Sequence, residues 1–165
     1  SMASARPDVL FLVFGGNDSQ VKTFQNNNRQ ANLKFMGYKQ YTLSKRLMLL
    51  VDFLLMPYQD KVSIGIPGHD TAQWMSPMKM FEYMASGVPV ISSDLPVLRE
   101  ILKHGKNSYL VPPDDPDKWI AALDYLLSNR AVADSLGKCA HSDYRENHTW
   151  KQRANYIMNL AGFPA

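Results

Sequence analysis

The chain has 165 residues, of which 45% are hydrophobic and 20% charged, so it is long enough to bury a core and too apolar to be disordered. Its formal net charge of +3 is small and its Lys and Arg residues are scattered, which argues against a general nucleic-acid binder. The single cysteine, Cys139, cannot form an internal disulfide, and no apolar run reaches transmembrane length, so we expect a cytoplasmic globular domain.

Strands and helices alternate along the first third of the chain. The apolar run VLFLVF at 9–14 ends in two glycines, which predicts a parallel strand buried on both faces. A polar helix is expected over 17–30, with Asp18 or Ser19 near its cap. The next expected elements are a strand over 33–36, a helix over 41–51, a strand over 53–56 and a long loop over 58–75.

The same alternation continues after the loop. Residues 77–86 read PMKMFEYMAS and predict a helix that Gly87 ends. VPVISS at 88–93 predicts a fourth buried strand, and Asp94 is placed to cap the helix after it. The remaining expected elements are a helix over 95–104, a strand over 108–111 and helices over 116–128, 130–145 and 149–161.

Strands that alternate with helices indicate right-handed crossovers and a parallel sheet with helices on both faces. The sequence therefore predicts an α/β fold, a Rossmann-like three-layer sandwich in which ligands bind outside the carboxyl ends of the strands. We interpret residues 1–6 as an expression scar and tail, and residues 7–165 as a single domain.

The helix over 77–86 combines a core face with charged residues. Ser76 is a good N-cap and Pro77 suits the first helical position, where its missing N–H costs nothing. The unpaired N–H groups and the dipole of a helix start form an anion site, particularly for a diphosphate. Lys79 lies in this first turn, where the dipole disfavours a cation, and an anion beside it explains that placement best.

Glu82 lies about one turn after Lys79, on a face apart from the apolar Met80 and Met84. This position suits hydrogen bonds from ribose hydroxyls, as acidic residues make in dinucleotide folds. The alternative interpretation is a weak surface ion pair between Lys79 and Glu82, which are three residues apart on one helix.

Two motifs add a resemblance to this pattern. The segments SPMKMFEYMASGVPVISSDLPVLREIL and GKNSYLVPPDDPDKWIAALDYLL closely resemble the C-terminal domain of family 4-type (group 1) retaining glycosyltransferases of GT-B architecture, which binds the nucleotide sugar. The resemblance also covers PDVLFLVFGG, LKFMGY, DFLLMPY and HTWKQRA, and so extends from residue 7 over nearly the whole chain.

The resemblance implies a role for each matching position. The backbone at Ser76, Pro77, Met78 and Lys79 would hold the diphosphate of a UDP- or GDP-linked sugar, and Glu82 would bind the ribose. Further residues implied at the edge of the site are Gly37 and Tyr38 on the nucleobase side, and Tyr58 and Glu100 on the side of the donor sugar.

The sequence departs from the family pattern at two points. Where the family has a first glutamate, eight residues before Glu82, this chain has Trp74, and His69 or Asp70 from the long loop is a weak candidate to replace it. The family also has an N-terminal acceptor domain and a strand and loop whose Arg and Lys clamp the diphosphate, and this chain begins after both. We therefore expect a fragment that does not catalyse transfer by itself.

Loss of that strand affects the expected sheet. Five strands that close up without it give the order 2-1-3-4-5, and the rival outcome is a gap that another chain fills or that stays strained. In a complete enzyme the 149–161 helix would cross back to the missing N-terminal domain. We therefore expect its apolar residues, Trp150, Tyr156, Ile157 and Leu160, to be partly exposed here, with aggregation or a homodimer as the consequence. The full-length parent would be cytoplasmic or membrane-peripheral.

The remaining histidines and tryptophans give little indication of function. His104, His141 and His148 have no spacing that suits a metal, so neither a metal nor a cofactor is expected. Trp119 and Trp150 lie at apolar helix positions and are interpreted as core residues. The competing functions are a non-catalytic flavodoxin-like module and part of a nucleotide-sugar epimerase; a receiver-type module would need acidic residues where Gly15-Gly16-Asn17 stands.

Overall fold

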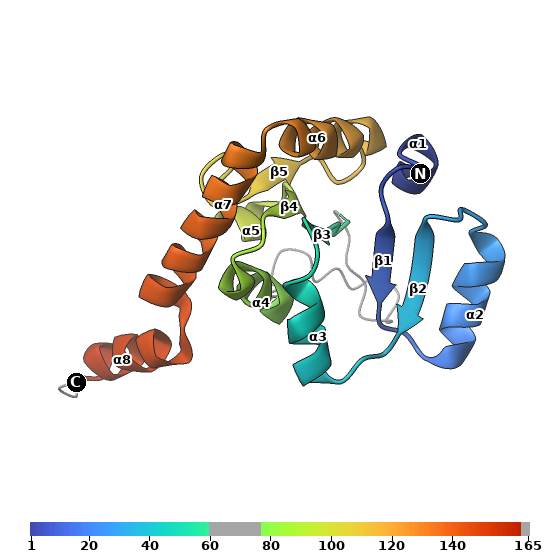
Figure 1. Cartoon of the computed structure of the whole chain (residues 1–165). Helices are drawn as coiled ribbons and strands as arrows, with labels where there is room; N and C mark the ends of the chain where they lie inside the picture. The colour runs from blue at the N-terminus through green and yellow to red at the C-terminus, as the bar shows by residue number, and fades with distance from the viewer. Residues whose placement is uncertain (60–76, 163–165) are drawn as a thin grey trace. The chain divides into compact units, whose positions relative to one another are not determined.

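The computed structural model describes residues 1–59 and 77–162 (Figure 1). The chain forms two compact units, Ser1–Leu50 and Val51–Ala165. The predicted His69, Asp70, Trp74 and Ser76 lie outside the described residues.

The first unit is built on a pair of parallel strands. Its elements are α1 (Met2–Ala5), β1 (Phe11–Phe14), α2 (Asp18–Asn27), β2 (Leu33–Gly37) and α3 (Tyr41–Met48). Phe11 of β1 is in register with Leu33 of β2. Helix α2 runs alongside β2 (Figure 1), where the rings of Phe24 and Phe35 stack 5.5 Å apart.

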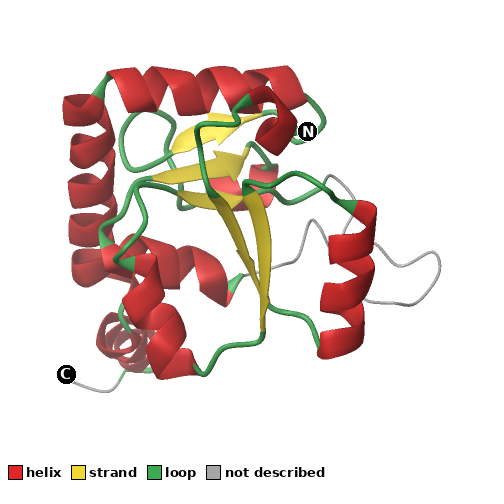
Figure 2. Ribbon diagram, turned by 45° about the vertical axis from the view of Figure 1, so that its right-hand side comes forward, coloured by secondary structure: helices red, strands yellow, loops and turns green. Residues whose placement is uncertain are grey.

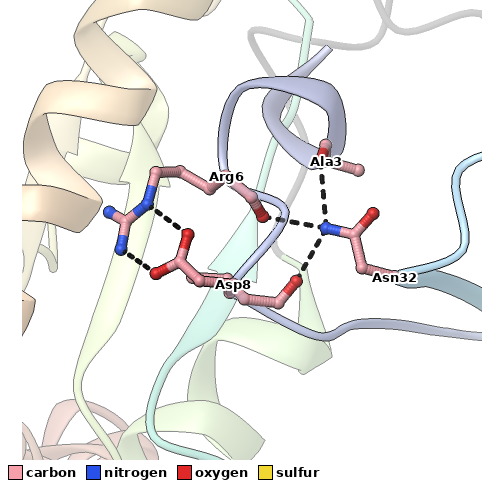
Figure 3. A network of polar contacts seen from close by, with 5 residues as sticks. Ala3, Arg6, Asp8 and Asn32 are labelled. Atoms are coloured by element: carbon pink, nitrogen blue, oxygen red, sulfur yellow. Dashed lines mark hydrogen bonds and ion pairs between the residues drawn. The ribbon is translucent and has the colours of Figure 1, made fainter.

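A polar network ties the N-terminal segment to the start of β2 (Figure 3). Asn32 Nδ2 donates to the backbone oxygens of Ala3 (3.0 Å), Arg6 (2.8 Å) and Val9 (2.8 Å). Arg6 also forms a two-armed ion pair with Asp8, and these hydrogen bonds lower the pKa of Asp8 to about 2. The segment interpreted as a scar and tail is thus a helix, α1, whose Ala3 is buried.

The second unit contains three parallel strands in the order β3-β4-β5. Figure 2 draws them in yellow, with helices packed beside them. The elements in chain order are β3 (Leu54–Met56), α4 (Met78–Ser86), β4 (Val90–Ser93), α5 (Pro96–Arg99), β5 (Tyr109–Val111), α6 (Pro116–Ser128), α7 (Arg130–Asp143), the π-helix η1 (Tyr144–His148) and α8 (Trp150–Leu160). All four residues of the central strand β4 are buried, which makes it the core of this unit.

Helices α4, α6 and α7 supply most of the remaining core of this unit. Helix α6 contacts β4 and β5, and α7 contacts α4 and α6. The largest fully buried apolar side chains of the described residues all lie in this unit: Met56, Met84, Ile91, Leu98, Leu102, Leu126, Leu136, Val90 and Val111.

The α/β class with parallel strands is confirmed. The neighbours 2-1 and 3-4-5 of the predicted order occur, but in two separate sheets, so the single five-stranded order stays a prediction. The expectation that the first strand is buried on both faces is wrong, because Val13 and Phe14 are 42% and 38% exposed. Among the described strands β1 is hydrogen-bonded to β2 alone, and the helix that packs on this pair, α2, contacts β2, so the end of β1 keeps part of its surface exposed.

One of two predicted helix starts needs correction. Helix α2 has Asp18 and Ser19 in its first turn, next to the cap, which Asn17 forms in a reciprocal capping box with Gln20. Asp94 does not cap α5; Leu95 takes that position, and the Asp94 carboxylate pairs with Arg99 instead.

The predicted helix over 95–104 is also too long, because α5 ends at Arg99. Asn107, which is buried, explains its early end. Its Oδ1 accepts from the backbone N–H of Lys103 at 2.7 Å, and its Nδ2 donates to the carbonyl oxygen of Ile101 at 3.2 Å. A side chain thereby takes backbone groups that a continuing helix would use itself.

The two tryptophans interpreted as core residues differ. Trp119 is buried, and its indole N–H donates to the carbonyl oxygen of Pro112 at 2.9 Å, as expected. Trp150 is 76% exposed, so that prediction is wrong: α8 contacts η1 and has no buried residue. The separate expectation of exposed apolar residues on the last helix is confirmed at Trp150, Tyr156, Ile157 and Leu160. Over the residues described, no helix is both long and apolar enough to cross a membrane.

Candidate functional site

The candidate site lies where α4 begins, next to Tyr58, which follows strand β3. Pro77 stands at the N-cap with extended backbone, and Met78 is the first helical residue. The prediction that Ser76 caps the helix and Pro77 opens it is therefore shifted by one residue, because the carbonyl of Pro77 accepts from the N–H of Met80 and closes the first turn. Capping by the Pro77 side chain is impossible, so the first-turn N–H groups of Met78 and Lys79 have no cap from that residue.

Helix α4 has the two faces that the sequence predicts. Met80 and Met84 are buried, whereas Met78 is 61% exposed and Lys79 is exposed as well. Phe81 packs against the His148 ring of η1, with the ring centroids 5.6 Å apart. The exposed start of the helix is therefore held by a buried face behind it.

The charged residues of α4 do not neutralise each other. Among the ion pairs of the residues that the structure describes, none joins Lys79 to Glu82. The Lys79 ammonium lies instead 6.0 Å from the centre of the Tyr58 ring, at the outer limit of a cation–π contact. The alternative of a surface ion pair is thus not what the structure contains, and Glu82 remains half-buried one turn further on.

Tyr58 is fixed by the carboxyl end of the neighbouring strand. The hydroxyl of Ser93, the last residue of β4, donates to the carbonyl oxygen of Tyr58 at 2.5 Å. Ser93 is fully buried, and the Tyr58 N–H donates to the carbonyl oxygen of Met56 at 3.1 Å. Partial burial raises the pKa of the Tyr58 phenol, so it is neutral at physiological pH.

Tyr83 is a further member of this site that the sequence did not indicate. Burial, and to a smaller extent the electrostatic effect of the nearby Tyr58 and Glu82, raises the pKa of its phenol to about 12. The phenol is therefore a neutral hydrogen-bonding group within electrostatic reach of both. Ser93 was missed as well, although a serine that ends a buried strand is a signal for a hydrogen bond to the adjacent loop.

Three further predicted positions belong to other elements. Glu100 is exposed after the end of α5, and no contact in the described segments joins it to Lys79 or Glu82. Gly37 and Tyr38 belong to the first unit; Gly37 ends β2 with φ +67° and Tyr38 is 75% exposed. Their assignment to the nucleobase side stays a prediction.

Asp94 and Arg99 form a second polar group beyond the carboxyl end of β4. Two hydrogen bonds of 2.5 and 2.6 Å join the carboxylate to the guanidinium. The hydrogen bonding lowers the pKa of Asp94. Because these two side chains bind each other, their charges are less available to a ligand than those of Lys79 and Glu82.

The far end of α4 has a different character. It ends at Gly87 with φ +73°, and His141 Nδ1 of α7 lies 2.9 Å from the carbonyl oxygen of Ala85. A polar hollow of about 730 Å³ opens there, lined by Ser86, Gly87, Lys138, His141, Ser142, Arg145, Glu146 and Gln152. No group of three His, Cys, Asp or Glu side chains that could hold a metal occurs in the part of the chain described.

The sequence matches the profile of the family described as "Glycosyl transferases group 1" over residues 2–129. The chain belongs to this family. The phosphatidyl-myo-inositol mannosyltransferase of Mycobacterium tuberculosis (strain CDC 1551 / Oshkosh) is 32% identical over 158 residues, which cover 93% of this chain and 38% of that protein. This group 1 glycosyltransferase chain therefore spans about 38% of the length of the first curated relatives that it matches.

Solved structures share the fold of this group 1 chain. Anabaena Alr3699/HepE in complex with UDP-glucose aligns with a TM-score of 0.73 at 17% identity, over 98% of this chain and 43% of that one. Sucrose-phosphate synthase from Thermosynechococcus elongatus aligns with a TM-score of 0.74 at 20% identity, over 97% of this chain and 40% of that one. At such identities the likeness establishes the Rossmann-like α/β fold.

Proposed function

We propose that this chain binds the nucleotide-diphosphate sugar of a retaining glycosyltransferase that transfers a hexose to an acceptor. The observation that supports the proposal is the start of α4, where the first-turn N–H groups and Lys79 precede Glu82 by about one turn, the order that a diphosphate and a ribose require. The names of a mannosyltransferase relative and of a UDP-glucose complex support a hexose, and the second name supports a UDP carrier.

The diphosphate and the ribose would contact different residues. The backbone N–H groups of Met78 and Lys79 would donate to the diphosphate, while the Lys79 ammonium neutralises part of its charge. Glu82, one turn later, would accept hydrogen bonds from the ribose hydroxyls. Ser76 would add to the diphosphate cradle from outside the described residues.

These interactions also bear on the reaction. When the bond from the sugar to the diphosphate breaks and the acceptor oxygen bonds to the same sugar carbon, negative charge develops on the leaving diphosphate. A cation and N–H dipoles fixed at that point stabilise the charge without reorganisation. We expect the chain to supply this half of the chemistry, with acceptor recognition in a separate domain and no transfer by the chain alone.

Isothermal titration of the chain with UDP, GDP and ADP tests the proposal. We expect one nucleotide to bind and Glu82→Ala to weaken that binding strongly, because the ribose loses its acceptor. Asp134→Ala, which removes an exposed carboxylate of α7, is the matched control and should bind like the unmodified chain. Failure of all three nucleotides to bind, or equal binding by Glu82→Ala, would contradict the proposal.

A further inference from the structure

The placement of Lys79 is unusual for two reasons: the helix dipole disfavours it, and the lysine does not pair with the nearby glutamate. The dipole of α4 repels a cation in its first turn, and Glu82 lies three residues on, where a lysine usually pairs with it. The structure contains no such pair; the ammonium lies 6.0 Å from the centre of the Tyr58 ring. Something other than its own helix therefore sets the direction of this side chain.

Tyr58 is built to provide that direction. It lies just beyond β3, where the buried Ser93 hydroxyl at the end of β4 holds its carbonyl oxygen at 2.5 Å. Tyr58 is half-buried, so neighbouring atoms restrict its side chain on one side. An aromatic face carries partial negative charge and attracts an ammonium without forming a full ion pair.

We propose that Tyr58 is a positioning residue whose ring holds the Lys79 ammonium beside the start of α4 and away from Glu82. The inference rests on the proposed function and deepens it. With Lys79 and Glu82 kept apart, the cation stays available to the diphosphate and the carboxylate to the ribose of one nucleoside diphosphate. A lysine that is already oriented loses less side-chain entropy when the anion binds.

This role differs from a direct contact between Tyr58 and the donor sugar. A positioning role needs the aromatic face and not the hydroxyl, whereas a direct polar contact needs the hydroxyl. Tyr58→Phe keeps the face, and Tyr58→Leu removes it while it keeps an apolar side chain of similar bulk. The two variants therefore separate the two roles.

The first experiment needs no ligand. The NMR signals of the Lys79 ε-methylene protons are recorded in the chain and in both variants, because a ring face shifts nearby protons upfield. We expect an upfield shift that Tyr58→Phe retains and Tyr58→Leu abolishes. A Lys79 signal at the same position in all three proteins would overturn the inference while it leaves the proposed function standing.

The second experiment is a double-mutant cycle by isothermal titration with UDP and GDP. Tyr58→Leu should weaken binding about two- to five-fold, as expected for one cation–π contact. The same change made in Lys79→Met should have no further effect, since no ammonium remains to be positioned. Tyr156→Leu, which alters an exposed tyrosine of α8, is the control and should not change binding.

The outcomes separate the two claims. Fully additive effects of Tyr58→Leu and Lys79→Met, or a loss of binding in Tyr58→Phe, would overturn the positioning role even though the chain binds a nucleotide. Absence of binding by the unmodified chain would remove the proposed function, and the inference with it. Circular dichroism of each variant identifies any that fails to fold. If Tyr58→Leu fails to fold, Tyr58→Phe decides the question, because the positioning role predicts that it retains both the upfield shift of Lys79 and the affinity for the nucleotide.

Discussion

The two ends of helix α4 are built for different purposes. At its C-terminal end Gly87 adopts φ +73°, and Ser86 both donates to the Tyr83 carbonyl (2.6 Å) and accepts from the N–H of Val88 (3.1 Å). Gly137 of α7 approaches so closely that an added Cβ would lie 2.1 Å from the Gly87 oxygen. Gly87 and Gly137 thus leave no room for a side chain between them, and the Ser86 hydroxyl is fully paired.

The N-terminal end is open by comparison. Met78 is 61% exposed, its N-cap residue Pro77 provides no side-chain cap, and within the described residues Lys79 lies near an aromatic ring and not near a carboxylate. The contrast teaches that one end of a short helix can be locked by packing so that the other presents its charges in a fixed place. Substitutions at the locked end should therefore change stability, and substitutions at the open end should change binding.

The strongest way to break the contrast is Gly137→Val. The new side chain meets the backbone of Gly87, which has no flexible atoms to move aside, so we expect a loss of unfolding free energy of about 3 kcal/mol or more. Urea denaturation measures it. Gly105→Ala is the control. It also replaces a glycine, which has φ +72° and open space around it, and should lower the free energy of unfolding by only about 1–2 kcal/mol. Equal losses in the two variants would contradict a locked end.

High pH should lower the free energy of unfolding through Tyr83, which lies in the middle of α4. Because the folded state raises the pKa of this phenol from 10.0 to about 12, the neutral form is favoured. Its contribution to stability is complete below pH 10 and is lost as the pH rises toward about 12, by roughly 2 kcal/mol. Denaturation series at pH 9 to 12 should show this fall, and Tyr83→Phe should reduce it. A variant with an unchanged pH profile would refute the assignment.

Lys79→Met sharpens the contrast from the open end. The substitution keeps most of the stem and removes the charge, so we expect affinity for the nucleoside diphosphate to fall about tenfold, the effect of one charge-assisted hydrogen bond. The urea midpoint should stay unchanged, because Lys79 is exposed. A large loss of stability with unchanged affinity would reverse the roles assigned to the two ends.

The smallest expected effect is at Ser93, which supports the open end from behind. Ser93→Ala removes the hydrogen bond to the Tyr58 carbonyl and should cost about 1 kcal/mol of stability and about a twofold loss of affinity. Ser92→Ala is the matched control, because Ser92 is equally buried but its hydroxyl reaches the Ser93 carbonyl instead. If both variants bind alike, Tyr58 does not depend on Ser93.

Local patterns were sufficient to predict most of the architecture. The strand at 88–93 and the two faces of the 77–86 helix follow from hydrophobic spacing, because burial of that spacing is what folds them. The motif around Lys79 and Glu82 also indicated the family. These features depend on neighbours in the sequence.

Features set by distant residues could not be predicted. The early end of α5 depends on the Asn107 side chain, and the direction of Lys79 depends on Tyr58. The burial of Trp150 depends on which element packs against α8, and the apolar spacing within α8 does not specify that element. Side-chain direction and tertiary contacts thus remained beyond the sequence pattern.

Backbone amide NMR during a titration with UDP or GDP tests the central claim most directly, because it observes both ends of α4 at once. The account predicts that the amide signals of Met78 and Lys79 shift with nucleotide concentration, while those of Ser86 and Gly87 stay in place. Shifts confined to Ser86, Gly87 and His141, or no shift in any of these residues at saturating nucleotide, would contradict a donor site at the start of the helix.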